Sequence, residues 1–98
     1  MHMAGTQYIG TGRLGTVQSA AYTTVSGVIT SGISAGVYKA RVVCTTAAYI
    51  VIGTTPTATT SDTYMSAGAA EYFTVTPGQK VAAVRVASDG TLNVTEIT

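Results

Sequence analysis

Residues that could carry out chemistry are few in this chain. Its 98 residues include one histidine, one cysteine and four acidic side chains. A Ser-His-Asp or Cys-His arrangement needs an imidazole held beside the nucleophile, and the only histidine, His2, is expected to be a solvated side chain. Asp62 and Glu71 could act as a carboxylate pair on a sugar, but their spacing favours solvated loop and strand-end positions. We therefore predict no catalytic residues and no enzymatic activity.

Two motifs superficially match a cofactor or metal site. Residues 10–15 read GTGRLG, which fits the GxGxxG dinucleotide fingerprint, but that fingerprint binds pyrophosphate only at the N-terminus of a helix. Residues 16–25 do not favour a helix, and no acidic residue occurs before Asp62. His2 between two methionines is a poor metal site. We predict no cofactor and no metal, and we expect Cys44, in an apolar strand, to be a buried structural thiol.

The composition limits the kinds of partner. Charged residues make up only 9% of the chain, the net charge is +1, and the mean hydropathy is +0.35. Three arginines and two lysines, scattered along the sequence, are too few for the phosphate neutralisation on which nucleic-acid binding depends. No apolar run approaches the roughly 20 residues that cross a bilayer, and no export signal is evident. We expect a protein that binds neither nucleic acid nor membrane and hides part of its surface in protein partners.

Short β-strands separated by turns dominate the second part of the chain. Runs rich in β-branched and aromatic residues, which favour a pleated sheet, lie at residues 41–44, 49–52, 71–75, 80–86 and 92–95. A short edge strand is expected near Thr63–Met65, after a Thr-rich loop. Because no helical pattern intervenes, the sequence predicts an all-β domain over residues 36–98, built as a small antiparallel β-sandwich or barrel.

Two turns and two strand faces can be predicted in more detail. Pro77–Gly78 favours a type II turn, and Asp89–Gly90 favours a type I′ hairpin between the last two strands. In residues 37–44 the even positions are the better core candidates, so Lys39 and Arg41 should face water or a partner. In the strand that begins at residue 80, the inward residues are expected to be Ala82, Val84 and Val86.

Residues 1–35 differ from the rest of the chain. Isolated apolar residues alternate with Gly, Ser and Thr, so this segment has little core of its own and is expected to be an extended N-terminal arm with short strands near residues 14–18 and 22–29. Tyrosine suits interfaces because it combines a large apolar body with a hydroxyl group. The residues expected to contact a partner are Tyr8, Ile9, Leu14, Tyr22, Val25, Ile29 and Tyr64.

Residues 41–96 resemble a group of small virion structural proteins of tailed bacteriophages. The matching segments are Arg41–Val43, Ile50–Gly53, Pro56–Ala58, Ala67–Gly68, Glu71–Phe73, Val75–Gly78, Lys80–Ala82 and Gly90–Thr95. The resemblance implies a capsid decoration (cement) protein, commonly a β-barrel or jelly-roll trimer on the phage head. Its partners would be the major capsid protein and further copies of itself, as a homotrimer.

The expected function is therefore a structural one, with two alternatives. The protein would bind and stabilise the major capsid protein lattice, and it would be localised in the virion (capsid), assembled in the host cytoplasm without a signal peptide. One alternative is a β module that binds a glycan or host surface through Tyr64 or Tyr72 and the loop at residues 54–66. The other is a head-tail connector or tail structural protein.

Overall fold

The computed structural model describes residues 12–98, and within that range every regular element is a β-strand. The strands are β1 (Leu14–Tyr22), β2 (Gly27–Val28), β3 (Lys39–Cys44), β4 (Ala48–Gly53), β5 (Thr63–Met65), β6 (Glu71–Thr74), β7 (Lys80–Arg85) and β8 (Gly90–Ile97). No helix in this part of the chain could span a membrane. The prediction of an all-β antiparallel fold is confirmed, and of the two predicted forms, sandwich or barrel, the strands form two separate sheets.

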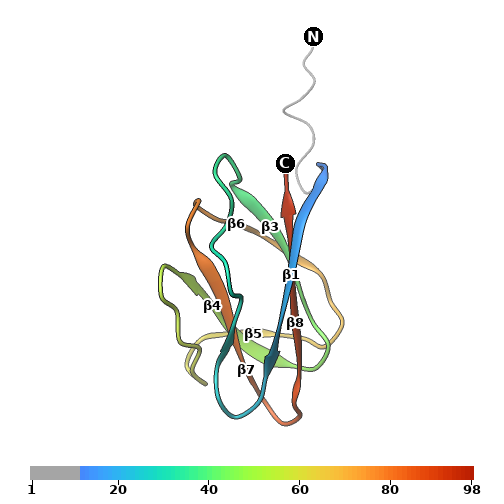
Figure 1. Cartoon of the computed structure of the whole chain (residues 1–98). Coiled ribbons are helices and arrows are strands. Elements are labelled where there is room, and N and C mark those ends of the chain that lie inside the picture. Colours follow the sequence, from blue (N-terminus) through green and yellow to red (C-terminus); the bar gives the residue numbers. More distant parts are fainter. Residues whose placement is uncertain (1–11) are drawn as a thin grey trace.

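The strands form two four-stranded antiparallel sheets that face each other (Figure 1). Sheet A has the order β1-β8-β3-β6, and sheet B has the order β2-β7-β4-β5. Every connection except the one between β4 and β5 therefore crosses from one sheet to the other. The chain brings the start of β1 beside the end of β8, where Arg13 and Thr98 exchange two backbone hydrogen bonds of 2.8 and 2.9 Å.

The main core lies between the two sheets. In β3 the side chains of Ala40, Val42 and Cys44 are fully buried, whereas Lys39 and Arg41 on the opposite face are half-buried. This alternation confirms the predicted faces of β3, because successive side chains of a strand point to opposite sides of the sheet. The largest fully buried side chains are Tyr22, Ile29, Met65, Leu92, Val42, Val75, Val81 and Val94.

Strand β7 is buried on both faces, which corrects its predicted inward side. Val81 and Ala83 contribute to the main core, while Ala82 and Val84 face outward into a second, smaller cluster with Ala58. The Thr-rich loop before β5 covers that outer face, and the Ala58 amide donates a hydrogen bond of 2.9 Å to Ser26 Oγ. The alternation of apolar and polar residues along a strand identifies one buried face, so it does not show that a loop also covers the opposite face of β7.

The turn at Pro77–Gly78 has the predicted type II geometry. Gly78 has a φ of +89°, and the Gln79 amide donates to the Thr76 carbonyl at 3.0 Å. A type II turn needs a positive φ at its third residue, which glycine adopts without steric cost. The Gly78 amide also donates to the Ile33 carbonyl at 2.8 Å, so the turn is attached to the segment that follows β2.

The predicted hairpin at Asp89–Gly90 is wrong. Strand β7 belongs to sheet B and β8 to sheet A, so the last two strands are not paired, and Gly90 is not among the glycines with positive φ. Gly90 is required instead for close packing. A Cβ at this position would overlap Thr46 Oγ1 and lie 2.5 Å from the Tyr22 hydroxyl oxygen. Glycine is therefore needed at position 90 because the connection between the two sheets leaves no space for a side chain, and not because a two-residue loop requires it.

The described part of the predicted N-terminal arm, residues 12–35, is built into the sandwich. Strand β1 pairs with β8 over almost its whole length, and β2 pairs with β7. Ile29 and Ile33 lie in the main core, and their amides donate to the Val81 and Gln79 carbonyls at 3.1 and 2.8 Å. The strand expected near residues 14–18 is present as β1, and residues 14–33 share their core with the rest of the sandwich. Weak hydrophobic periodicity misled the prediction because β1 is an edge strand and β2 is only two residues long.

Candidate interaction surface

Most of the carboxylates take part in local structure. Asp89 forms an ion pair of 2.7 Å with Arg85, and Asp62 accepts a hydrogen bond of 2.7 Å from the Thr59 amide. Glu96 is buried and accepts hydrogen bonds from the amide and the hydroxyl of Ser34, both at 2.9 Å. Among residues 12–98 no group of three or more His, Cys, Asp or Glu side chains is placed to hold a metal ion.

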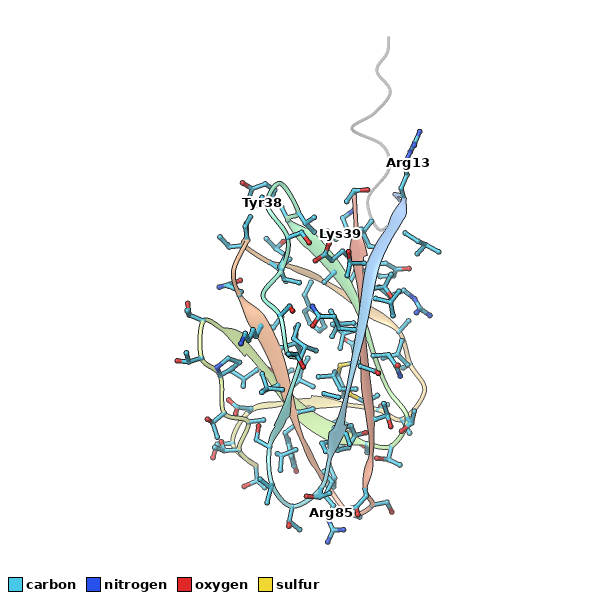
Figure 2. All side chains as sticks on the ribbon, in the orientation of Figure 1. Arg13, Tyr38, Lys39 and Arg85 are labelled. Atoms are coloured by element: carbon cyan, nitrogen blue, oxygen red, sulfur yellow. The ribbon has the colours of Figure 1, made fainter. Side chains whose placement is uncertain are left out.

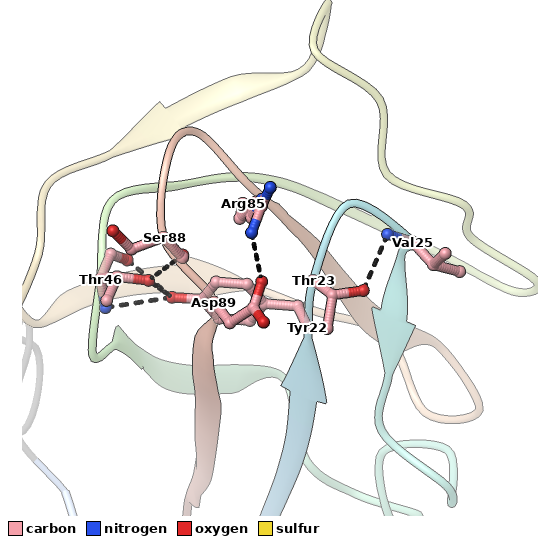
Figure 3. A network of polar contacts seen from close by, with 7 residues as sticks. All are labelled: Tyr22, Thr23, Val25, Thr46, Arg85, Ser88 and Asp89. Atoms are coloured by element: carbon pink, nitrogen blue, oxygen red, sulfur yellow. Dashed lines mark hydrogen bonds and ion pairs between the residues drawn. The ribbon is translucent and has the colours of Figure 1, made fainter.

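Cys44 and Tyr22 lie together in the core. Burial raises the pKa of the Cys44 thiol, and a hydrogen bond with Tyr22 opposes this shift in part. The Tyr22 hydroxyl donates to the Thr46 carbonyl at 2.7 Å and accepts from the Thr46 amide at 3.1 Å, while Thr46 Oγ1 donates to the Ser88 carbonyl at 2.9 Å (Figure 3). This network ties the end of β1 to two sheet-crossing turns. A thiolate nucleophile is disfavoured here, and the cysteine is structural in character.

The outward side of sheet A, which we call the sheet A face, has an exposed apolar and aromatic surface with two basic residues. Strand register places its residues in cross-strand rows. Val17 pairs with Thr95, Thr95 with Arg41, and Arg41 with Tyr72; the neighbouring row joins Leu14, Ile97, Lys39 and Thr74. Leu14, Val17 and Tyr72 are 75%, 63% and 45% exposed. The sheet A face is therefore defined by Leu14, Val17, Lys39, Arg41, Tyr72 and Thr95.

Basic side chains gather at one end of the molecule. In Figure 2, Arg13 and Lys39 lie at the same end of the sandwich as Tyr38, and Arg85 lies at the opposite end. Arg85 is neutralised by Asp89, whereas Arg13 and Arg41 form no ion pair with any residue in the described part of the chain. The sheet A face and its adjoining rim therefore carry two arginines, Arg41 and Arg13, without an ion pair to a described residue, although the whole chain carries a net charge of only +1.

The outward side of sheet B has a different character. Tyr49 and Tyr64 are cross-strand neighbours whose rings meet edge to face with centroids 6.0 Å apart. Tyr64 is 54% exposed, and beside the pair lie Val51, Val84 and the covering residue Ala58. An edge-to-face tyrosine pair offers a flat apolar surface bordered by hydroxyl groups. This sheet B patch could receive an apolar or sugar face, but loop residues already cover part of it.

A shallow cleft of about 210 Å³ opens between the two sheets where β4 and β6 approach each other. Its lining consists of Ile50, Val51, Ile52, Asp62, Thr63 and Phe73. Small-molecule sites usually measure about 300–1,000 Å³ and place several polar groups around the ligand. This cleft is smaller, and Asp62, its only carboxylate, is occupied by the Thr59 amide.

Some of the residues that were expected to contact a partner are exposed in the structure, and others are buried. Leu14, Val25 and Tyr64 are exposed, in agreement with such a role, but they do not form one patch. Tyr22 and Ile29 are buried, with 1% and 0% exposure, so their assignment as partner contacts is wrong. Both fill the main core because β1 and the segment after β2 are part of the sandwich. Tyr8 and Ile9 lie outside the described residues.

Of the residues that the register brings together on the sheet A face, sequence reasoning selected Leu14 as a partner contact and Tyr72 only for the glycan alternative. Val17 and Tyr72 join Arg41 only through pairing between strands that are distant in the sequence. The alternation in β3 was a usable signal, because it placed Lys39 and Arg41 on the outward side. No sequence pattern showed that β1 and β6 lie in the same sheet as β3.

No protein-family model, no curated protein and no solved structure matches this chain.

Proposed function

We propose that the chain is a structural virion protein that decorates the head of a tailed phage. In this proposal it binds the major capsid protein lattice, stabilises it against expansion and rupture, and acts as a homotrimer. Its place is the virion, and it needs no cofactor. The observation that carries the proposal is the order in which the strands pair.

The pairing supports a jelly roll. When a long hairpin of eight strands is wrapped into two sheets, strand 1 pairs with 8, 2 with 7, 3 with 6 and 4 with 5. All four of these pairs are present, and β3–β8 and β4–β7 complete the two sheets. Eight-stranded jelly rolls are characteristic of viral capsid and lectin domains and of cupins.

A fold alone does not define a function, so the sequence resemblance selects among these classes. The expected resemblance of residues 41–96 to small phage virion proteins supports the virion class, and those residues span most of β3 and β8 and all of the strands between them. The surface supports the same choice. A chain that is only 9% charged, with several exposed apolar and tyrosine side chains, has the composition of a protein that buries surface against partners.

Attachment to a lattice also suits the absence of a deep pocket in the described residues. Apolar contact contributes about 25 cal/mol per Å² before association costs are subtracted, so each copy can bind with modest affinity. A trimer attached at several points then gains from effective concentration. No chemical step is needed.

Binding to purified heads tests the proposal directly. Heads assembled from the major capsid protein without this chain should retain it on co-sedimentation, reach saturation at a fixed stoichiometry, and melt at a higher temperature than bare heads. Light scattering of the free protein should give the mass of three chains. If the protein stays in the supernatant and leaves the melting temperature of the heads unchanged, the proposed function is wrong.

The second candidate function is glycan binding, which the Tyr49–Tyr64 pair favours. Tyrosine rings stack on the apolar faces of sugars, and jelly rolls include lectins. A glycan array would separate the two candidates. Specific retention that is lost in Tyr64→Ala, together with no binding to heads, would favour the glycan-binding function.

A further inference from the structure

The distribution of charge on the molecule points to a particular face for the partner. Asp62, Asp89 and Glu96 already have partners within the fold. Glu71 begins the edge strand β6 in register with Val42, on the side of the strand opposite Tyr72, and it is exposed. The outward side of the sheet therefore carries no carboxylate in its paired positions.

Two arginines on that side and at its rim, Arg41 and Arg13, form no ion pair with a described residue. Arg41 is half-buried between Thr95 and Tyr72, its cross-strand neighbours. Arg13, at the adjoining rim, makes no ion pair with another described residue. A guanidinium that is partly removed from water gains most from a carboxylate that arrives with a partner, because its fork of N–H donors matches the two carboxylate oxygens.

The residues around Arg41 have the composition of an interface centre. Tyrosine and arginine are the residues most enriched at binding hot spots, and the sheet A face places Arg41 and Tyr72 in one row with the exposed Val17. Leu14 extends the apolar area toward Arg13. By contrast, the sheet B patch is partly covered by its own loop, and the one arginine paired in sheet B, Arg85, lies in a row with the core residues Ala48 and Met65 instead of the patch.

We infer that the sheet A face is the docking surface, and that its partner is a protein surface bearing carboxylates positioned to meet Arg41. This inference rests on the proposed function, since the partner is taken to be the capsid lattice, and it adds which face binds and by which chemistry. Nucleic acid is disfavoured as the partner because three basic residues at one end are too few to neutralise a phosphate backbone.

Charge reversal at two matched positions tests the inference. Arg41→Glu and Lys80→Glu change the net charge by the same amount, but Lys80 lies on β7 in sheet B. Affinity for heads should fall about tenfold or more in Arg41→Glu, because the new carboxylate would oppose those of the partner, and by less than about threefold in Lys80→Glu. Raising the salt concentration should weaken wild-type binding and have a smaller effect on Arg41→Gln.

The outcomes separate the inference from the proposed function. If the wild-type protein does not bind heads, the proposed function fails. If it binds heads and Lys80→Glu weakens binding as much as Arg41→Glu, the inference fails while the function stands. Tyr72→Ala provides a second, uncharged variant should Arg41→Glu not fold, and unchanged affinity in Tyr72→Ala would also overturn the assigned face. Tight binding of a single-stranded DNA 30-mer at physiological salt, lost in Arg41→Glu while head binding persists, would overturn the assignment of a protein partner.

Discussion

Replacing Gly90 by alanine should destabilise the fold through the Tyr22 hydroxyl group. The new Cβ would lie 2.5 Å from the phenol oxygen and 2.8 Å from Thr45 Oγ1, and it would overlap Thr46 Oγ1. These atoms belong to the end of β1 and to the turn between β3 and β4, so they cannot all move away. Overpacking of this kind costs about 1–3 kcal/mol, which corresponds to a fall in Tm of roughly 5–20 °C for a domain of this size.

A double-mutant cycle with Tyr22→Phe tests the stated cause. Tyr22→Phe removes the hydroxyl that meets the new Cβ, and it also leaves the Thr46 amide and carbonyl without their phenol partner, at a cost of about 1–3 kcal/mol. Because relieving the clash displaces the same hydroxyl, the two costs overlap. We expect Gly90→Ala to cost about 1 kcal/mol less in the Tyr22→Phe background than in the wild type, measured by urea denaturation.

Gly36→Ala is the matched control for this cycle. Gly36 has a φ of +80° and no atom within 4 Å of an added Cβ, so its alanine variant is strained by backbone conformation alone. Its cost should be the same with either residue at position 22. If Gly90→Ala is also additive with Tyr22→Phe, the steric account of Gly90 is refuted, and the glycine must be required for another reason.

Three further outcomes are expected. Ile29→Ala should lower the free energy of unfolding by about 2–5 kcal/mol and Val25→Ala by less than about 0.5 kcal/mol, because Ile29 is buried and Val25 is 72% exposed; equal effects in urea denaturation would contradict the inclusion of this segment in the core. Native Cys44 should resist thiol reagents until the protein unfolds, and because its folded-state pKa is raised above the ordinary value of 9.0, stability should be unaffected by this group below pH 9.0 and decrease as pH rises above it. Glu96→Ala should cost about 1–3 kcal/mol by leaving the Ser34 amide and hydroxyl without their acceptor, and full stability in thermal melts would show that water replaces the carboxylate.

Local signals predicted much of the fold. β-branched runs located β3, β4, β6, β7 and most of β8, and the type II turn followed from the conformational limits of Pro77 and Gly78. These features depend on neighbours in the sequence. The weakest predictions were those that depend on which sheet a strand joins, because hydrogen-bonded partners in this fold are mostly far apart along the chain.

The Asp89–Gly90 pair shows why such local reasoning can fail. An Asp-Gly pair between two strands favours a tight hairpin, but here the connection must cross between the sheets. Asp89 pairs with Arg85 instead, and Gly90 leaves space for the hydroxyl groups of Tyr22, Thr45 and Thr46. The same residue types satisfy a different requirement, and only the tertiary arrangement distinguishes the two.

The candidate surface was less predictable than the fold because it depends on register. A shift of β3 by one residue would turn Lys39 and Arg41 into the core and expose Ala40 and Val42, since a strand's side chains alternate between faces. Because Ala40, Val42 and Cys44 are buried, Lys39 and Arg41 must lie on the outward side of the sheet. Pairing with β6 and β8 then places Tyr72 and Thr95 beside Arg41. The net charge of +1 does not reveal this arrangement, because three of the four acidic groups have partners elsewhere in the fold and the fourth, Glu71, is exposed on the opposite side of β6 from Tyr72. A half-buried arginine without an ion pair to a described residue is thus a consequence of the packing of β3, and in our proposal the partner supplies its carboxylate.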